Sequence, residues 1–214
     1  MDEDLSIVNS NTRNEKIKNF FVNNKNKFIS IIIILIVLIM SVFSYDKYSI
    51  NKKKEISDKF NTITIDYSEK TKDKTAESLI EIINKKDPTY SPLSLYFIID
   101  NSLVTNKVKI NSLFDLLIED TSLDSEIKNL IVYKKALYNA DNATESDLLN
   151  ILNPLINSNS VWKSHALYLM AEYFFVENQN QKAKEFFNKI ISLENSNPDI
   201  RLQAEKRLNR DLSE

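Results

Sequence analysis

The sequence predicts an all-α protein with an N-terminal transmembrane helix followed by a stack of antiparallel helix pairs. Three observations lead to this fold class. Residues 28–45 form an apolar run that contains no charged side chain. The chain beyond it places apolar side chains three and four residues apart, which is the spacing of one helix face. A set of these apolar positions also recurs about every 35 residues, as in proteins built from repeated helix pairs.

The apolar run predicts a membrane anchor. A helix needs about 20 apolar residues to cross the hydrocarbon core, and the run has nearly that length. In lipid, a single segment satisfies its own backbone hydrogen bonds only as a helix. We therefore expect a flexible tail at residues 1–27 on one side of the membrane, an anchor at 28–48, and a membrane-proximal helix or connector at 49–73. A cleaved signal peptide is the alternative, but the tail and the apolar core are long for one.

The charges that flank the run do not determine its orientation. Equal numbers of Lys and Arg side chains lie within about 20 residues on each side, so the positive-inside rule favours neither topology. The run itself has no ionisable group, which favours an anchor over a transport path. The basic residues are Arg13, Lys16, Lys18, Lys25 and Lys27 before the run, and Lys47, Lys52, Lys53, Lys54 and Lys59 after it.

The composition excludes several kinds of chemistry. A net charge of −2 is unlike the clustered basic excess of nucleic-acid-binding proteins. The chain has no Cys, which removes thiolate catalysis and Cys-based zinc sites, and no Gly, which removes glycine-rich phosphate loops. His165 is its only histidine. We therefore expect a non-enzymatic protein with no cofactor, metal, nucleic-acid partner or small-molecule substrate.

The periodicity and the turn residues predict eight helices in a domain at residues 74–214. Ser91 and Asn197, each followed by Pro, are expected N-caps, and Thr144 with Asp147 is close to a capping box. Pro154 should kink or end its helix after the preceding residue. The helices are expected near residues 74–86, 92–105, 109–120, 124–140, 145–157, 161–178, 180–193 and 198–212.

The repeat appears in both helices of each pair. A helix pair of this length cannot bury its apolar face alone, so stacking of the pairs is the physical consequence. In the second helices the recurring positions are Leu79, Leu113, Leu148 and Ala183; Ile82, Leu116, Ile151 and Phe186; and Ile83, Leu117, Leu152 and Phe187. In the first helices they are Phe97, Val132 and Leu167, and, four residues later, Asn101, Ala136 and Ala171.

The last helix pair resembles the tetratricopeptide repeat. Asn178 stands at the usual turn glycine, where Asn tolerates a left-handed backbone. Two features depart from the motif, because Ile190 replaces a small residue and Pro198 comes late. The final helix has Ile200, Ala204, Leu208 and Leu212 on one face, as expected of a capping helix. The motif positions are Leu167, Met170, Ala171 and Phe174 in the first helix, and Ala183, Phe187 and Ile190 in the second.

The layout of tail, single anchor, connector and tetratricopeptide-like domain resembles the bacterial ancillary SecYEG translocon subunit family. The resemblance implies a single-pass inner-membrane protein with a cytoplasmic N-terminus and a periplasmic C-terminal domain. It also implies an accessory role at the export translocon, with chaperone-like contacts to exported proteins. Two alternatives remain open: an anchored scaffold for envelope assembly or division complexes, and a cytosol-facing receptor with reversed topology.

The tetratricopeptide resemblance also implies a protein-binding face built from the first helices. An apolar, aromatic groove there can hold an extended or helical peptide. The alternative, equally open, is that a neighbouring helix buries the same residues. Trp162 is expected to pack in the core or to contact a partner. The expected groove residues are Leu130, Tyr133, Leu137, His165, Tyr168, Glu172 and Phe175, with Leu95, Ile98 and Ser102 from the preceding pair.

Overall fold

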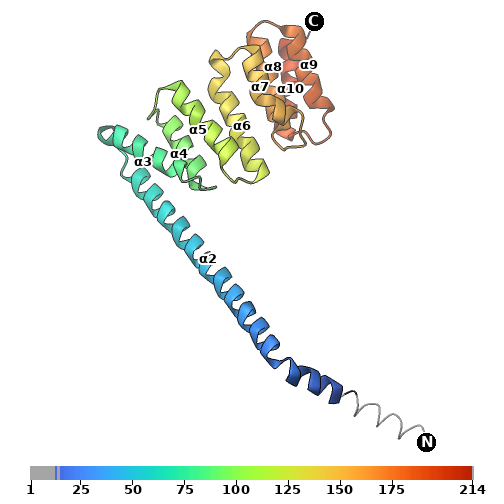
Figure 1. Cartoon of the computed structure of the whole chain (residues 1–214). Helices are drawn as coiled ribbons and strands as arrows, with labels where there is room; N and C mark the ends of the chain where they lie inside the picture. Colours follow the sequence, from blue (N-terminus) through green and yellow to red (C-terminus); the bar gives the residue numbers. More distant parts are fainter. Residues whose placement is uncertain (1–12, 14, 214) are drawn as a thin grey trace, which may run out of the picture. The chain divides into compact units, whose positions relative to one another are not determined.

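A computed structural model of the chain describes residues 13 and 15–213 (Figure 1). The described residues are mainly helical and contain no β-strand, which confirms the all-α class. They form two compact units, one ending at Glu55 and one beginning at Ile56. Residues 15–23 are helical. The helices that follow are α2 Lys25–Ile65, α3 Lys72–Asn84, α4 Tyr90–Asp100, α5 Lys107–Asp120, α6 Ser125–Asn139, α7 Glu145–Ile156, α8 Lys163–Val176, α9 Asn180–Ser192 and α10 Pro198–Asp211, with short 3-10 helices at Glu69–Thr71 and Ala140–Asn142.

Helix α2 contains the apolar run and is long and apolar enough to span a membrane. Its most apolar window is not buried inside the protein at all. Large apolar side chains from Ile29 to Phe43 are each about half exposed or more. Exposed apolar surface is unfavourable in water in proportion to its area, so this exposure is consistent with a helix that spans a membrane.

The eight helices expected after residue 73 are all present, with ends shifted by a few residues. The Thr144 capping box forms, and the Asn197 side chain caps α10. Asn178 has a φ of 58°, which confirms the left-handed turn expected there. Two details were wrong. Ser91 does not cap α4; it is buried inside that helix, and its hydroxyl donates to the Ile82 carbonyl at 2.9 Å. Pro154 does not end its helix, because α7 continues to Ile156.

The packing of the larger unit follows the order of the chain. From α3 to α10, each helix packs against the next, and α8 also contacts α6 and α10. Figure 1 shows these helices as a row of short antiparallel hairpins. The interior consists of two apolar clusters. One is built mainly on α3 to α5, with Ile56 of α2 and Ile131 of α6, and the other on α6 to α10. Ile118 of α5 packs against both.

Burial follows the repeat found in the sequence. Two of the three series in the second helices are buried at every member, while the third is buried in α3 and half-buried later. Because equivalent residues meet equivalent surroundings, the apolar pattern and the packing share one period. The buried series are Leu79, Leu113, Leu148 and Ala183, and Ile83, Leu117, Leu152 and Phe187.

The starts of the first helices repeat as well. At α4, α6, α8 and α10 a polar side chain accepts a hydrogen bond from a backbone N–H two residues further on. At α6 and α10 the side chain is the N-cap and satisfies a donor that has no partner within the helix. Before α4 and α8 it holds the turn that precedes the helix. They are Asp87, Asp124, Ser160 and Asn197, which are spaced by 37, 36 and 37 residues. Because α10 also begins with such a side chain, it corresponds to the first helix of a pair whose second helix is not among the described residues.

The end of α2 belongs to the same compact unit as the helix pairs. Ile56 is buried, and the ring of Phe60 lies 5.6 Å from that of Tyr90. The Tyr90 hydroxyl donates to the Ser57 hydroxyl at 2.7 Å. Ser57 and Tyr90 are 33 residues apart, close to the period of the repeat. The last turns of α2 therefore supply the helix that covers the first pair.

If the buried series holds the domain together, its members are costly to truncate. Leu117→Ala removes a completely buried side chain and is expected to lower the free energy of unfolding by about 2–5 kcal/mol. Leu93→Ala, at a largely exposed site in α4, is the matched control and should change it by less than about 0.5 kcal/mol. Urea unfolding of the detergent-solubilised protein measures both, and equal effects would contradict this account of the core.

Candidate functional site

The expected groove residues lie on two neighbouring helices, α6 and α8, which contact each other. Leu130, Tyr133 and Leu137 are on α6, and Leu137 is 46% exposed. The α8 members are half-buried rather than fully open: His165, Tyr168, Glu172 and Phe175. On α4 the expected groove residues Leu95 and Ile98 are completely buried, as in the alternative in which neighbouring helices cover them. The open part of this face is therefore narrower than the repeat pattern alone implies.

An aromatic cluster fills the space between the start of α8 and the middle of α6. The Tyr133 ring stacks on Trp162 with centroids 5.8 Å apart, and His165 lies 5.0 Å from Trp162 and 5.7 Å from Tyr133. Burial lowers the pKa of His165, and the Val161 carbonyl only partly opposes this effect. Burial also raises the pKa of Tyr133. Trp162 thus packs against the chain's own aromatic residues, and His165 is held in its neutral form.

The C-terminal helix covers the other end of α8. Two guanidinium nitrogens of Arg207, on α10, donate to the two carboxylate oxygens of Glu172 at 2.8 and 2.6 Å. The same guanidinium lies 5.0 Å from the ring centroid of Phe175 and donates to Asp211 at 2.8 Å. Hydrogen bonds to Asp211 and Glu172 raise the pKa of Arg207. Such two-point contacts are stronger than single ones, so this part of the face is closed.

Tyr168 lies beside the contact between Arg207 and Glu172. Its ring meets Phe187 of α9 edge-on at 5.5 Å. Burial raises the pKa of the Tyr168 hydroxyl, and the neighbouring Glu172 carboxylate raises it further. Tyr168 therefore contributes to the joint between α8, α9 and α10 and leaves only part of its surface accessible.

The accessible part of the face is an apolar stripe along α6, made of Ile127, Leu130 and Leu137. Ile127 is 42% exposed and Leu137 46%. The three residues are spaced by three and seven, which places them on one side of a helix. Beside them the Lys134 ammonium lies 4.4 Å from the ring centroid of Tyr96 on α4, and burial raises the pKa of Tyr96 to about 12. The sequence analysis missed Ile127, although its spacing to Leu130 was a sufficient signal.

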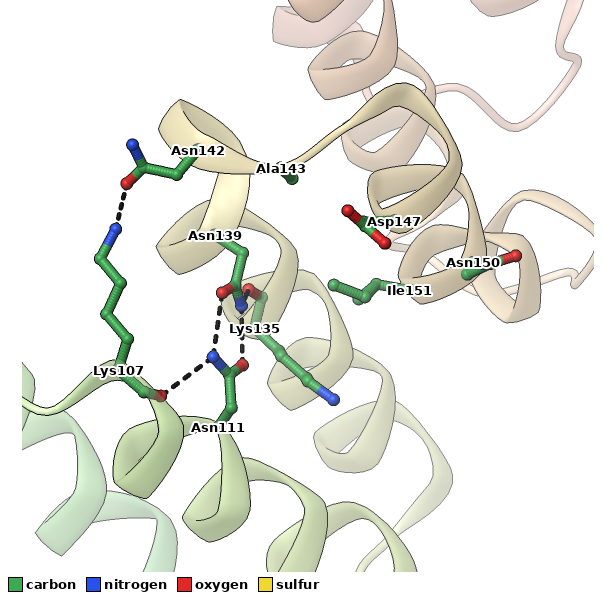
Figure 2. A pocket seen from close by; sticks show the side chains of 9 residues that line it. All are labelled: Lys107, Asn111, Lys135, Asn139, Asn142, Ala143, Asp147, Asn150 and Ile151. Carbon is green, nitrogen blue, oxygen red and sulfur yellow. Dashed lines mark hydrogen bonds between the residues drawn. The ribbon is translucent and has the colours of Figure 1, made fainter.

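A second hollow, of about 480 Å³, lies between α5, α6 and α7 (Figure 2). The side-chain amides of Asn111 and Asn139 donate to each other at 3.0 and 2.8 Å, and Lys107 donates to Asn142. The polar groups are therefore largely engaged with one another. The sequence did not reveal this hollow, because Asn and Lys are frequent throughout the chain. It is lined by Lys107, Asn111, Lys135, Asn139, Asn142, Ala143, Asp147, Asn150 and Ile151.

The function has to be argued from this geometry. Among the described residues, no group of three or more His, Cys, Asp or Glu side chains could hold a metal ion. No protein-family model, curated protein or solved structure matches the chain. The features available are an apolar helix long enough for a membrane and a helical domain with one accessible apolar stripe.

The burial of His165 predicts a pH dependence of stability. Its pKa in the folded protein is below the ordinary value of 6.5, so the unfolded chain binds this proton more readily. Stability from this group is complete above pH 6.5 and decreases as the pH falls below that value. The urea midpoint should therefore be higher at pH 7.5 than at pH 5.5, and His165→Gln should make this difference smaller. A midpoint difference unchanged by the substitution would show that His165 titrates as it does in water.

The contact between Arg207 and Glu172 can be measured by a double-mutant cycle with Ala substitutions. We expect a coupling energy of about 1 kcal/mol or more, because the pair is largely buried and bidentate. The more exposed pair Glu145 and Lys182 is the control, with an expected coupling below about 0.5 kcal/mol. Urea unfolding provides both values. Coupling no larger than in the control would mean that α10 is only loosely held on α8.

Proposed function

We propose that the protein is a membrane-anchored helical-repeat protein that binds another protein through the apolar stripe on α6. The observation that carries the proposal is the exposure of Ile127 and Leu137 on a helix whose opposite side is buried at Val132 and Ala136. An exposed apolar stripe on a helix can receive the apolar side chains of a partner segment.

Three features support a tetratricopeptide-like stack as the architecture. The buried positions recur through α3, α5, α7 and α9. A polar side chain that accepts a hydrogen bond from the backbone N–H two residues further on recurs at or just before the start of α4, α6, α8 and α10. The left-handed residue Asn178 stands in the turn between α8 and α9, and Ser102 occupies the corresponding turn between α4 and α5 with a φ of 49°. Helix α10 then closes the array by covering α8.

The proposed membrane anchor is the apolar part of α2. Anchoring confines the domain to a layer near the bilayer, which raises its effective concentration toward partners in the same membrane. A weak apolar contact on α6 is then sufficient for association. The mechanism needs no conformational change and no bound cofactor.

Within this class we propose the role that the overall layout implies. The protein would be a single-pass protein of the bacterial inner membrane with its C-terminal domain in the periplasm. It would assist the export translocon through chaperone-like contacts to emerging proteins. The runner-up is a scaffold for an envelope assembly or division complex. The cover of α10 over Glu172 and Phe175 favours this second role, because a narrow binding stripe suits one dedicated partner.

The test is in-cell crosslinking from a photoreactive residue at Ile127. Crosslinks to translocon subunits or to several exported proteins are expected. Leu137→Lys places a charge in the stripe and should weaken association about tenfold or more, as for other buried contact residues. Leu202→Lys is the matched control, because Leu202 is 49% exposed on α10, and it should leave the crosslinks unchanged.

Each outcome separates the candidate roles. One recurrent partner would favour the scaffold, and many exported clients would favour the translocon accessory. Crosslinks to cytosolic proteins alone would support the reversed topology, which a compartment-specific reporter at the C-terminus checks independently. No difference between the two Lys variants would rule out the α6 stripe as the binding surface.

A further inference from the structure

The residues just before the apolar run form a short helix of their own. Residues 15–23 are helical, and a turn at Asn24 separates them from α2. The side-chain amide of Asn24 donates to the Phe20 carbonyl at 2.9 Å, as does its backbone N–H at 3.1 Å. A side chain that bonds to the backbone in this way competes with the regular helix ladder and favours an interruption. The chain therefore has a separate helical segment at the entrance to the proposed membrane span.

This helix is amphipathic. Ile17, Phe20 and Phe21 are spaced i, i+3, i+4, which places them on one face, and they are 49%, 58% and 53% exposed. At 100° per residue, Glu15, Asn19 and Asn23 lie on the opposite side, together with one apolar residue, Val22. The two lysines of the helix, Lys16 and Lys18, lie at the two borders of the apolar face. Lysines at these borders can extend their charged ends toward water while their stems cover apolar surface.

Basic residues strongly outnumber acidic ones around this helix. Residues 13–27 contain five basic side chains and a single acidic one, Glu15. Two of the basic residues, Lys25 and Lys27, lie between the short helix and the apolar run. These residues and the Asn side chains beside them require a polar environment. If the run spans the bilayer, the headgroup layer is therefore at residues 24–27, and the short helix begins at that depth.

We propose that residues 15–23 form an interfacial helix that lies on an anionic membrane surface. Ile17, Phe20 and Phe21 enter the boundary of the acyl chains, Lys16 and Lys18 contact anionic headgroups, and Asn19 and Asn23 face water. Apolar burial combined with basic side chains is the general basis of such binding. The inference rests on the proposed membrane anchor, because α2 holds the short helix at the interface.

The test uses the full-length protein in vesicles of phosphatidylethanolamine and phosphatidylglycerol. The chain has no Cys, so a single introduced thiol is unique. Cys is placed at 17, 20 and 21, at 19 and 23, and at 36 inside the apolar run. A membrane-impermeant maleimide is expected to label residues 17, 20 and 21 about tenfold more slowly than 19 and 23, as for side chains inserted into the interface. Position 36 should not react.

Charge is tested in the Phe20→Cys background. Lys16→Gln with Lys18→Gln should restore fast labelling, as should vesicles of phosphatidylcholine alone. Asn19→Gln with Asn23→Gln keeps the charge and is the matched control, with labelling still slow. Protection that is insensitive to both charge and lipid would overturn the assignment to anionic headgroups.

The remaining outcomes are distinguishable. Fast labelling at 17, 20 and 21 with position 36 protected would overturn the interfacial helix and leave the anchor standing. Fast labelling that includes position 36 would overturn the anchor itself. Equal protection at all six positions would show that the segment is part of the span. Protection found in native membranes but absent from vesicles would assign the face to a protein partner and overturn the lipid proposal.

Discussion

The helical domain depends on burial that no single hairpin can achieve alone. Helices α3, α5, α7 and α9 each carry apolar residues three or four positions apart, and residues such as Leu79 and Phe187 have no exposed surface. Each hairpin leaves part of its apolar surface uncovered unless another hairpin lies against it. This requirement favours the packing of each helix against the next along the chain.

Polar contacts then follow the same period. Lys86 bonds to Asp120, Glu126 to Ser160 and Glu172 to Arg207, with 34, 34 and 35 residues between the partners. The exposed pair of Lys86 and Asp120 adds little stability, but all three contacts reject a shifted register because the partners would no longer meet. At the two ends of the helical domain, other helices cover the apolar surface of the terminal pairs. The end of α2 covers the first pair, and α10 covers the last with a face made of Ala204 and its apolar neighbours.

Much of this could be predicted from the sequence because it depends on periodicity and local backbone chemistry. Helix number, the repeated apolar positions, the Thr144 box and the turn at Asn178 all belong to this class. The cover over the expected groove could not be predicted, because Glu172 resembles any solvated Glu until Arg207 is placed beside it. Two local expectations also failed for tertiary reasons: a buried carbonyl receives the Ser91 hydroxyl, and α7 accommodates Pro154 near its end.

The exposure of the expected groove residues was harder to predict than the helices, because exposure also depends on contacts between helices. Leu95 and Ile98 match the pattern of a groove but are buried in the core, and Ile127 was overlooked on a helix that was correctly placed. The helix at residues 15–23 was also missed, because nine residues rich in Asn and Lys give a weak periodic signal. Which apolar residues remain uncovered after packing depends on contacts between helices, and the proposed binding surface depends on it in turn.

The central claim is that residues about one repeat apart lie side by side. Because the chain has no Cys, it can be tested with paired thiols and a short bifunctional maleimide on the full-length protein. Lys86→Cys with Asp120→Cys, and Glu145→Cys with Lys182→Cys, should each crosslink within one chain. Lys86→Cys with Glu145→Cys, which lies nearly two repeats away, should not. Failure of both one-repeat pairs in a protein that keeps its helical spectrum would contradict the stack.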